Sequence, residues 1–275
     1  MEFTAAFVER EYNNRELVPE HPAFFARWER DSRFVRETLP GVFDVPYGPH
    51  ERQRMDLFPA PRSARLLVFI HGGYWRALDK HFFSWLAASW VAAGVSVAIP
   101  NYRLCPSVRI EDIVDDIVAA MNWLFANAGT HGVRTERVVV SGHSAGGHLT
   151  AALFAAARES LAFDTARIAG GVPISGIFDF EPLPLFSGNA DLRLDAGQVE
   201  RLNLYDRNPV IAAPMVVAVG AKESSEFQRQ SKVIADAWDP QVKELLVLPD
   251  LHHFSVVDAF AERSNALYET TLALF

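Results

Sequence analysis

The chain has 275 residues, 49% of them hydrophobic and 22% charged, which is enough for one large globular domain (1–275) with a substantial core. Its net charge of −8 and the lack of any Lys/Arg-rich block argue against nucleic acid as a partner. Charged residues interrupt every apolar run short of a membrane span, and residues 1–4 lack the basic start of a signal peptide, so we expect a cytoplasmic protein with no membrane partner.

The first 40 residues predict a mostly helical lead-in (1–40). A helix is expected to begin at His21-Pro22, because proline is tolerated in the first turn of a helix, and Pro40-Gly41 closes the segment. Two short strand-like runs follow, at 42–45 and 54–58, around a turn-rich stretch. We expect them to pair as a hairpin at the edge of a sheet.

The remainder of the chain alternates between apolar strand-like runs and amphipathic helical runs. This alternation predicts an α/β fold, a mainly parallel sheet with helices on both faces. Residues 177–210 carry no strand pattern, and we interpret them as a small cap that passes over the sheet. The expected strands are 66–70, 95–100, 137–141, 168–174, 215–219 and 244–248; the expected helices are 82–93, 111–128, one from the serine turn to about 158, 225–238 and one at the C-terminus.

The most informative motif is the G-x-S-x-G sequence at 142–146, which contains Ser144 and lies between the strand 137–141 and a helical run. This context is typical of a nucleophile held at a strained strand-to-helix turn. Side chains at Gly142 and Gly146 would clash there, because strand and helix pass very close together. The motif therefore predicts Ser144 as the nucleophile, with the N–H of Ala145 as an oxyanion donor.

A second motif, His71-Gly72-Gly73, follows the buried strand 66–70. Glycines at the carboxyl end of a strand let the backbone approach a substrate, so Gly72 and Gly73 are expected to complete the oxyanion hole. We expect His71 to order this loop rather than to touch the substrate.

A serine hydroxyl needs a base, and the position after the last strand favours a histidine for this role. His253 and its rival His252 both stand at this position, and the preference for His253 comes from the resemblance given below. An acid should follow the preceding strand, where Glu223 is the first choice. Asp179 is the serious alternative, and Asp250, on the histidine's own loop, comes last.

Aromatic residues gather after the glycines and in the predicted cap. Most of them are expected in the core, but two or three facing Ser144 would favour a flat aryl substrate. The candidate substrate contacts are Tyr74, Trp75 and His143. The aromatic residues in question are Tyr74, Trp75, Phe82, Phe83, Trp85, Phe178, Phe180 and Phe186.

Taken in order, these motifs resemble the α/β-hydrolase type of kynurenine formamidase (arylformamidase), a relative of the H-G-G-G esterases. The resemblance implies hydrolysis of N-formyl-L-kynurenine to kynurenine and formate, with Ser144 as nucleophile, His253 as base, and Gly72, Gly73 and Ala145 as the oxyanion hole. The family usually has aspartate followed by Ser-Pro-Glu-Phe where this chain has Glu223 followed by Ser-Ser-Glu-Phe. The matching segments are 44–48, 55–58, 71–75, 101–106, 142–149, 174–179, 225–231 and 253–254.

The sequence predicts no cofactor and no metal. Gly-rich phosphate-binding motifs are lacking, and the single cysteine, Cys105, excludes an internal disulfide and a multi-cysteine metal site. A small-molecule substrate is the expected partner, and a homodimer is left open. A carboxylesterase acting on small acyl or aryl esters is the alternative to the formamidase, and a non-catalytic binding protein on a hydrolase scaffold is the competing class.

Overall fold

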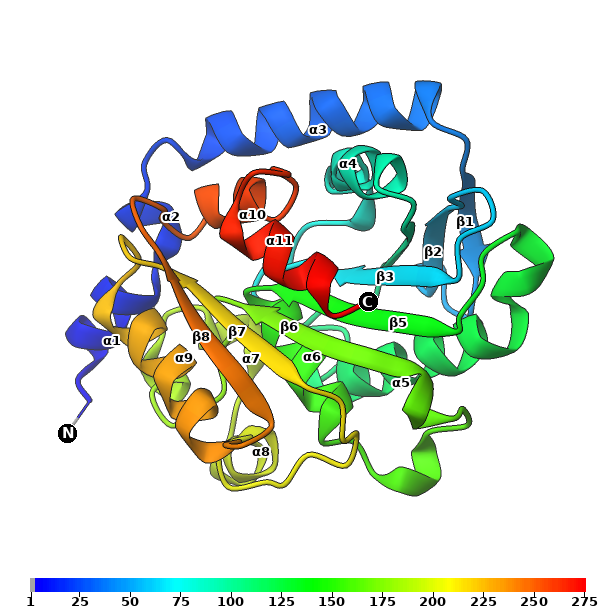
Figure 1. The fold of residues 1–275 in the computed structure, drawn as a ribbon. Coiled ribbons are helices and arrows are strands. Elements are labelled where there is room, and N and C mark those ends of the chain that lie inside the picture. The colour runs from blue at the N-terminus through cyan, green and yellow to red at the C-terminus, as the bar shows by residue number, and fades with distance from the viewer. Residues whose placement is uncertain (1–2) are drawn as a thin grey trace.

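The computed structural model describes residues 3–275 and contains one eight-stranded sheet with the order β1-β2-β4-β3-β5-β6-β7-β8 (Figure 1). Strand β2 runs antiparallel to both of its neighbours, the edge strand β1 and β4, and the six strands β3 to β8 are parallel to one another. The α/β fold and the edge hairpin predicted from the sequence are therefore confirmed. The strands are β1 Val42–Pro46, β2 Arg54–Phe58, β3 Arg65–Ile70, β4 Ser96–Pro100, β5 Arg137–His143, β6 Ile168–Ile174, β7 Met215–Gly220 and β8 Val242–Leu248.

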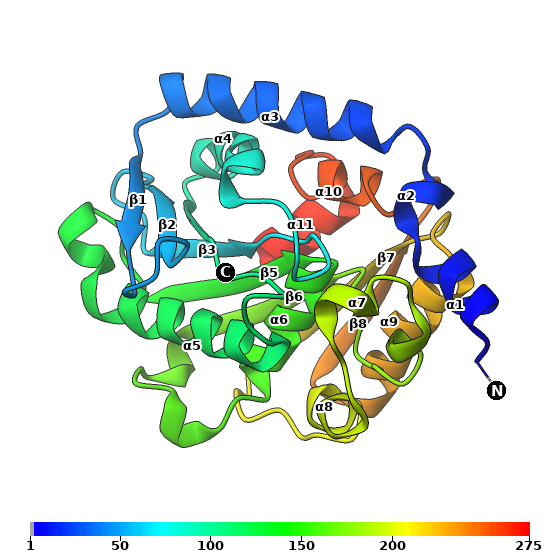
Figure 2. The same ribbon diagram turned by 180° about the vertical axis from the view of Figure 1, so that it is seen from behind.

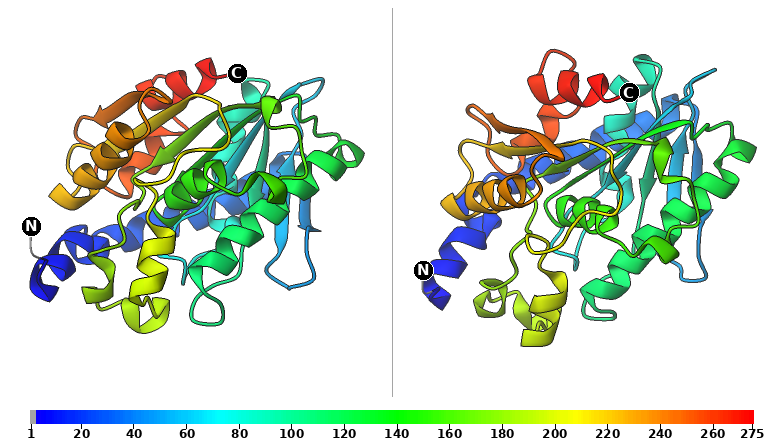
Figure 3. Two further views of the ribbon diagram at one scale, coloured as in Figure 1. Left: turned by 90° about the horizontal axis from the view of Figure 1, so that it is seen from below. Right: turned by 60° about the horizontal axis from the view of Figure 1, so that its bottom comes forward.

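Helices cover both faces of this sheet, as expected for parallel strands that are buried on each side (Figures 1 and 2). One face packs on α3 (His21–Thr38), α4 (Ala87–Ala92), α10 (Ser255–Ala259) and α11 (Ala266–Ala273). The other packs on α5 (Ile110–Asn127), α6 (Ala145–Phe154) and α9 (Ser225–Ala237). Seen from below, the green and orange helices of this second layer lie in front of the sheet (Figure 3).

Three helices differ from their predicted bounds. The expected helix 82–93 begins as two 3-10 turns, Lys80–Phe82 and Ser84–Leu86, before α4. Helix α6 ends at Phe154 rather than near 158, because the Phe154 carbonyl accepts the N–H groups of Val210 and Ile211. The C-terminal segment forms two helices, since Asn265 caps a new helix, α11.

Two segments add helices beyond these layers. The lead-in contains α1 (Ala5–Tyr12) and α2 (Asn14–Leu17) besides α3, and α1 lies beside α9 (Figures 1 and 3). The predicted cap, 177–210, contains α7 (Asn189–Leu192) and α8 (Ala196–Leu202). Among residues 3–275, no helix has the length and apolar character needed to cross a membrane.

Candidate active site

Ser144 lies at the turn between β5 and α6, at the carboxyl edge of the sheet. Its backbone has φ 57° and ψ −118°, a conformation that non-glycine residues rarely adopt, and it precedes the first residue of α6. A Cβ atom at Gly142 would meet the Gly146 carbonyl, and one at Gly146 would meet the Ile70 carbonyl. The crowding predicted at these two glycines is therefore confirmed, and it explains why the turn excludes side chains there.

His253 and Glu223 form a buried pair beside this turn. The Nδ1 atom of His253 lies 2.7 Å from Oε2 of Glu223. The other oxygen of Glu223 accepts the Ser175 hydroxyl at 2.5 Å and the Gly220 N–H at 2.8 Å. These bonds fix the carboxylate, which in turn holds the imidazole with its Nε2 atom free for another partner.

The rival acids and the rival histidine are engaged elsewhere. Asp179 forms an ion pair with Arg229 at 2.8 Å. Asp250 pairs with Lys222 on the surface. The Nδ1 atom of His252 accepts two backbone N–H groups that follow it in its own loop. The structure thus brings Glu223 to His253 and leaves these three residues outside the pair.

His143, the residue before Ser144, contacts the backbone of the loop that carries His253. Its Nε2 donates to the His253 carbonyl at 2.7 Å, and the ring is buried. Burial and the neighbouring His253 hold the pKa of His143 well below its usual range, so the ring is neutral at pH 7. Ring and carbonyl together fix the start of the His253 loop relative to the serine turn.

Tyr102 contacts the peptide groups of the loop His71-Gly72-Gly73, called the glycine loop below. The Tyr102 hydroxyl lies 2.8 Å from the carbonyl of His71 and 3.3 Å from that of Gly72. Nδ1 of His71 also donates to the Gly72 carbonyl, at 2.7 Å. In a planar trans peptide the N–H lies opposite the carbonyl, so the N–H groups of Gly72 and Gly73 face away from Tyr102. The loop can therefore present two backbone donors on one side.

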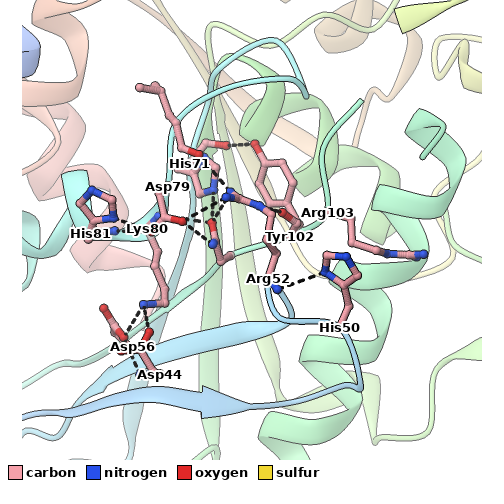
Figure 4. Close-up of polar contacts among 12 residues, drawn as sticks. Asp44, His50, Arg52, Asp56, His71, Asp79, Lys80, His81, Tyr102 and Arg103 are labelled. Carbon is pink, nitrogen blue, oxygen red and sulfur yellow. Dashed lines mark hydrogen bonds and ion pairs between the residues drawn. The ribbon is translucent and has the colours of Figure 1, made fainter. Parts of the chain in front are cut away.

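A buried polar network supports this loop (Figure 4). Asn101 lies 2.9 Å from Nε2 of His71 and donates to Asp79 at 2.6 Å. Arg52 donates to Asn101 at 3.0 Å and to the Tyr102 carbonyl at 2.8 Å. His71 is fully buried and stacks on the Tyr102 ring, so it orders the loop without reaching the cavity.

A cavity of about 220 Å³ connects these groups. Ser144, His253, His143 and both glycines, Gly72 and Gly73, lie in its wall. No hydrogen bond among residues 3–275 joins the Ser144 hydroxyl to His253, a contact that in many enzymes tightens only once substrate is bound. The remaining wall combines polar, charged and aliphatic residues with six aromatic side chains, those of Phe25, Trp28, Tyr74, Phe83, Phe186 and Phe254.

The cavity wall shows which of the aromatic residues named from the sequence line the same cavity as Ser144. Tyr74, Phe83 and Phe186 are three of the eight named from the sequence. Trp75 requires a correction, because it is fully buried, lies outside the cavity wall and packs on the rings of His148 and Phe180. A sharp backbone turn at positive φ, which begins at Gly73, sends the adjacent Tyr74 and Trp75 side chains in different directions.

Sequence reasoning missed the contribution of the lead-in. Phe25 and Trp28 of α3 and the segment 13–15 line the cavity, although they lie far from every catalytic motif in the sequence. Periodicity predicts that such helices exist but not where they dock, so no local signal could have found them. Among residues 3–275, no cluster of three or more His, Cys, Asp or Glu side chains could hold a metal ion.

The fold and the geometry of this edge define an α/β hydrolase, and the family comparison agrees. A family model described as alpha/beta hydrolase fold matches residues 67–232, so the chain belongs to this family and is a hydrolase. The matched range runs from β3 through the glycine loop and the serine turn into α9. It includes Glu223 and ends before His253.

Individual relatives are similar over nearly the whole chain. A kynurenine formamidase from Salmo salar is 26% identical over 278 residues, covering 94% of this chain and 89% of that protein. A solved structure from Silicibacter sp. tm1040, provisionally described as a thioesterase, is 31% identical with a TM-score of 0.85, covering 96% and 98% of the two chains. Esterase B from Lactobacillus rhamnosis shares the fold at 19% identity and a TM-score of 0.69, covering 95% and 94%.

Proposed function

We propose that this protein is a serine hydrolase that cleaves an aryl formamide, such as N-formyl-L-kynurenine, to the aryl amine (here kynurenine) and formate. The observation that carries the proposal is the bond from Glu223 to His253, whose ring lines a cavity together with Ser144 and the glycine loop. The aromatic side chains of the wall suit a flat ring, and the kynurenine formamidase relative cleaves a substrate of this kind by its name.

In the proposed reaction, Nε2 of His253 removes the proton of the Ser144 hydroxyl as its oxygen bonds to the formyl carbon. The carbonyl oxygen becomes an oxyanion that accepts N–H groups from Ala145, Gly72 and Gly73. The C–N bond then breaks, and His253 passes its proton to the departing aryl amine. A formyl ester remains on Ser144.

Water completes the cycle. His253 removes a proton from water, the resulting hydroxide oxygen bonds to the formyl carbon, and the ester bond to Ser144 breaks as that proton returns to the serine. Glu223 holds the imidazole in the orientation that both half-reactions require and stabilises its charged form. These steps use only side chains and backbone groups of this chain, so we propose that no cofactor or metal takes part. A cytoplasmic location belongs to the same proposal.

Hydrolysis of small acyl or aryl esters is the second candidate, because the same acyl-enzyme chemistry applies and the relative with 31% identity is described as a thioesterase. We expect kcat/KM for N-formyl-L-kynurenine to exceed that for a p-nitrophenyl ester. If kcat/KM is much higher for the ester, the protein is a carboxylesterase and the formamidase proposal is wrong. Covalent labelling of Ser144 by a fluorophosphonate, read by mass spectrometry, tests the chemistry itself, and a folded protein that stays unlabelled would point to a non-catalytic binding protein.

A further inference from the structure

The end of α1 is fixed to α9 and to Tyr74, which follows the glycine loop, by polar contacts, two of them buried. The Tyr12 hydroxyl donates to Glu226 at 2.7 Å and accepts the side-chain amide of Gln230 at 2.8 Å. The Ser224 hydroxyl donates to the Glu11 carbonyl at 2.7 Å, and the Tyr74 hydroxyl donates to the Tyr12 carbonyl at 2.5 Å. Two of these partners, Glu226 and Gln230, belong to the segment 225–231 singled out in the sequence, so part of that segment serves to dock the lead-in.

Docking places residues 13–15 in the wall of the cavity that holds Ser144. Asn14 is 4% exposed, and its amide nitrogen has no hydrogen-bond partner among residues 3–275. A buried amide left unpaired is costly, and native structures seldom retain one without a ligand or water to satisfy it. This side chain is therefore available to a group bound in the cavity.

Arg15, the next residue, supplies the positive charge of this wall. It forms no ion pair among residues 3–275, and its guanidinium lies 5.8 Å from the centre of the Phe25 ring, which also lines the cavity. The other arginine of the wall, Arg76, is neutralised by Asp191 at 2.6 Å. The wall thus carries one uncompensated cation beside an unpaired amide.

We propose that Asn14 and Arg15 bind a carboxylate at the end of the substrate remote from the bond that Ser144 attacks. A guanidinium and an amide are donors well matched to a carboxylate, and charge-assisted bonds of this kind are the stronger ones. This inference rests on the proposed function and makes it more specific. The preferred substrate is an aryl formamide whose ring also bears a side chain with a carboxylate, as the amino-acid group of N-formyl-L-kynurenine does.

The test compares two substrates that share a ring and a scissile bond. N-formyl-L-kynurenine carries the carboxylate, whereas N-(2-acetylphenyl)formamide lacks the whole amino-acid group. We expect the unaltered protein to prefer the first in kcat/KM. Arg15→Ala should lower kcat/KM for N-formyl-L-kynurenine about tenfold or more, mainly through KM, and leave that for N-(2-acetylphenyl)formamide within about twofold.

Three further variants sharpen the test. Asn14→Asp puts an acidic group in the same wall and should lower kcat/KM for N-formyl-L-kynurenine alone. Arg15→Lys keeps the charge and should retain part of the preference. Arg33→Ala removes an exposed arginine of α3 that lies outside the cavity wall, and should leave kcat/KM unchanged for both substrates.

The outcomes separate the two proposals. If neither formamide is cleaved, the proposed function fails and the inference fails with it. If both formamides are cleaved equally well, or if Arg15→Ala lowers both rates alike, the formamidase proposal stands and the carboxylate site is overturned. The folding of each variant is checked by its circular dichroism melt, and equal losses on both substrates overturn the carboxylate site when the Arg15→Ala variant melts like the unaltered protein.

Discussion

Two groups of polar residues flank Ser144, and they support it in different ways. On one side, Ser175, Glu223 and His253 form a line of side chains that ends at the cavity. On the other side, Tyr102 and the network behind His71 contact the peptide groups of the glycine loop and never reach the cavity themselves (Figure 4). In the proposed mechanism the first group handles a proton, whereas the second orients backbone dipoles.

This difference predicts unequal sensitivity to substitution. In the proposed mechanism, proton transfer passes through the single ring of His253, held by the single carboxylate of Glu223, so we expect no other residue to replace either one. The glycine loop is held by several hydrogen bonds from Tyr102 and His71, and the loss of one leaves the others in place. Four predictions test this contrast, beginning with the largest effect.

The Glu223→Gln variant should lose most activity. Glutamine keeps the shape but favours the wrong imidazole tautomer, so we expect kcat to fall about 10⁴-fold, as for comparable acids in catalytic triads. Steady-state kinetics with an aryl ester or formamide measures this. Asp179→Asn is the matched control and should keep kcat near that of the unaltered protein. Equal losses in the two variants would contradict the proposed role of Glu223.

The Tyr102→Phe variant should have a smaller effect. Removal of the hydroxyl loosens the glycine peptides without removing an oxyanion donor, so kcat should fall about tenfold with KM little changed. Tyr47→Phe is the control, because that buried hydroxyl donates to the Asn101 carbonyl and not to the glycine loop. A loss confined to stability, with kcat intact, would show that Tyr102 only packs.

The stability of the protein should depend on pH through its buried histidines. Burial lowers the pKa of His148 to about 3, from the 6.5 of an exposed histidine, and lowers the pKa of His143 as well. Between pH 6.5 and about 3, His148 binds a proton in the unfolded chain but not in the folded one. The free energy of unfolding therefore falls as pH drops below about 6.5.

Thermal melts at a series of pH values measure this dependence. Both ring nitrogens of His148 lack partners among residues 3–275, so His148→Leu deprives no other group of a hydrogen bond. The substitution should therefore flatten the decline in Tm below pH 6.5. An unchanged slope in this variant would assign the pH dependence to other groups.

Chelation should have the smallest effect. The proposed chemistry needs only Ser144, His253, Glu223 and backbone donors, so we expect dialysis against EDTA to leave kcat/KM unchanged. A loss of activity that returns on addition of a divalent cation would contradict the proposed mechanism.

Much of the fold follows from local sequence. Continuous apolar runs such as 66–70 and 138–140 are typical of strands buried on both faces, and the glycines around Ser144 mark a turn too tight for side chains. Glu223 and His253 were found by their positions after β7 and β8, because parallel strands bring their carboxyl ends to one edge.

The rest depended on contacts between distant segments. Arg52, Asp79 and Asn101 meet only because three loops converge, and none of them stands in a pattern that signals this. Trp75 lies next to a cavity residue in the chain yet points into the core. The docking of the lead-in relies on Tyr12 meeting Glu226, a pair separated by 214 positions, which neither helical periodicity nor a motif encodes.

The docked lead-in has a practical and an evolutionary consequence. Since residues 13–15 form part of the cavity wall, the proposed carboxylate site would place selectivity and turnover in separable parts of the polypeptide. Exchange of that short terminal stretch between homologues offers a route to new preferences without disturbing the chemical machinery, and purification tags are better placed at the opposite terminus.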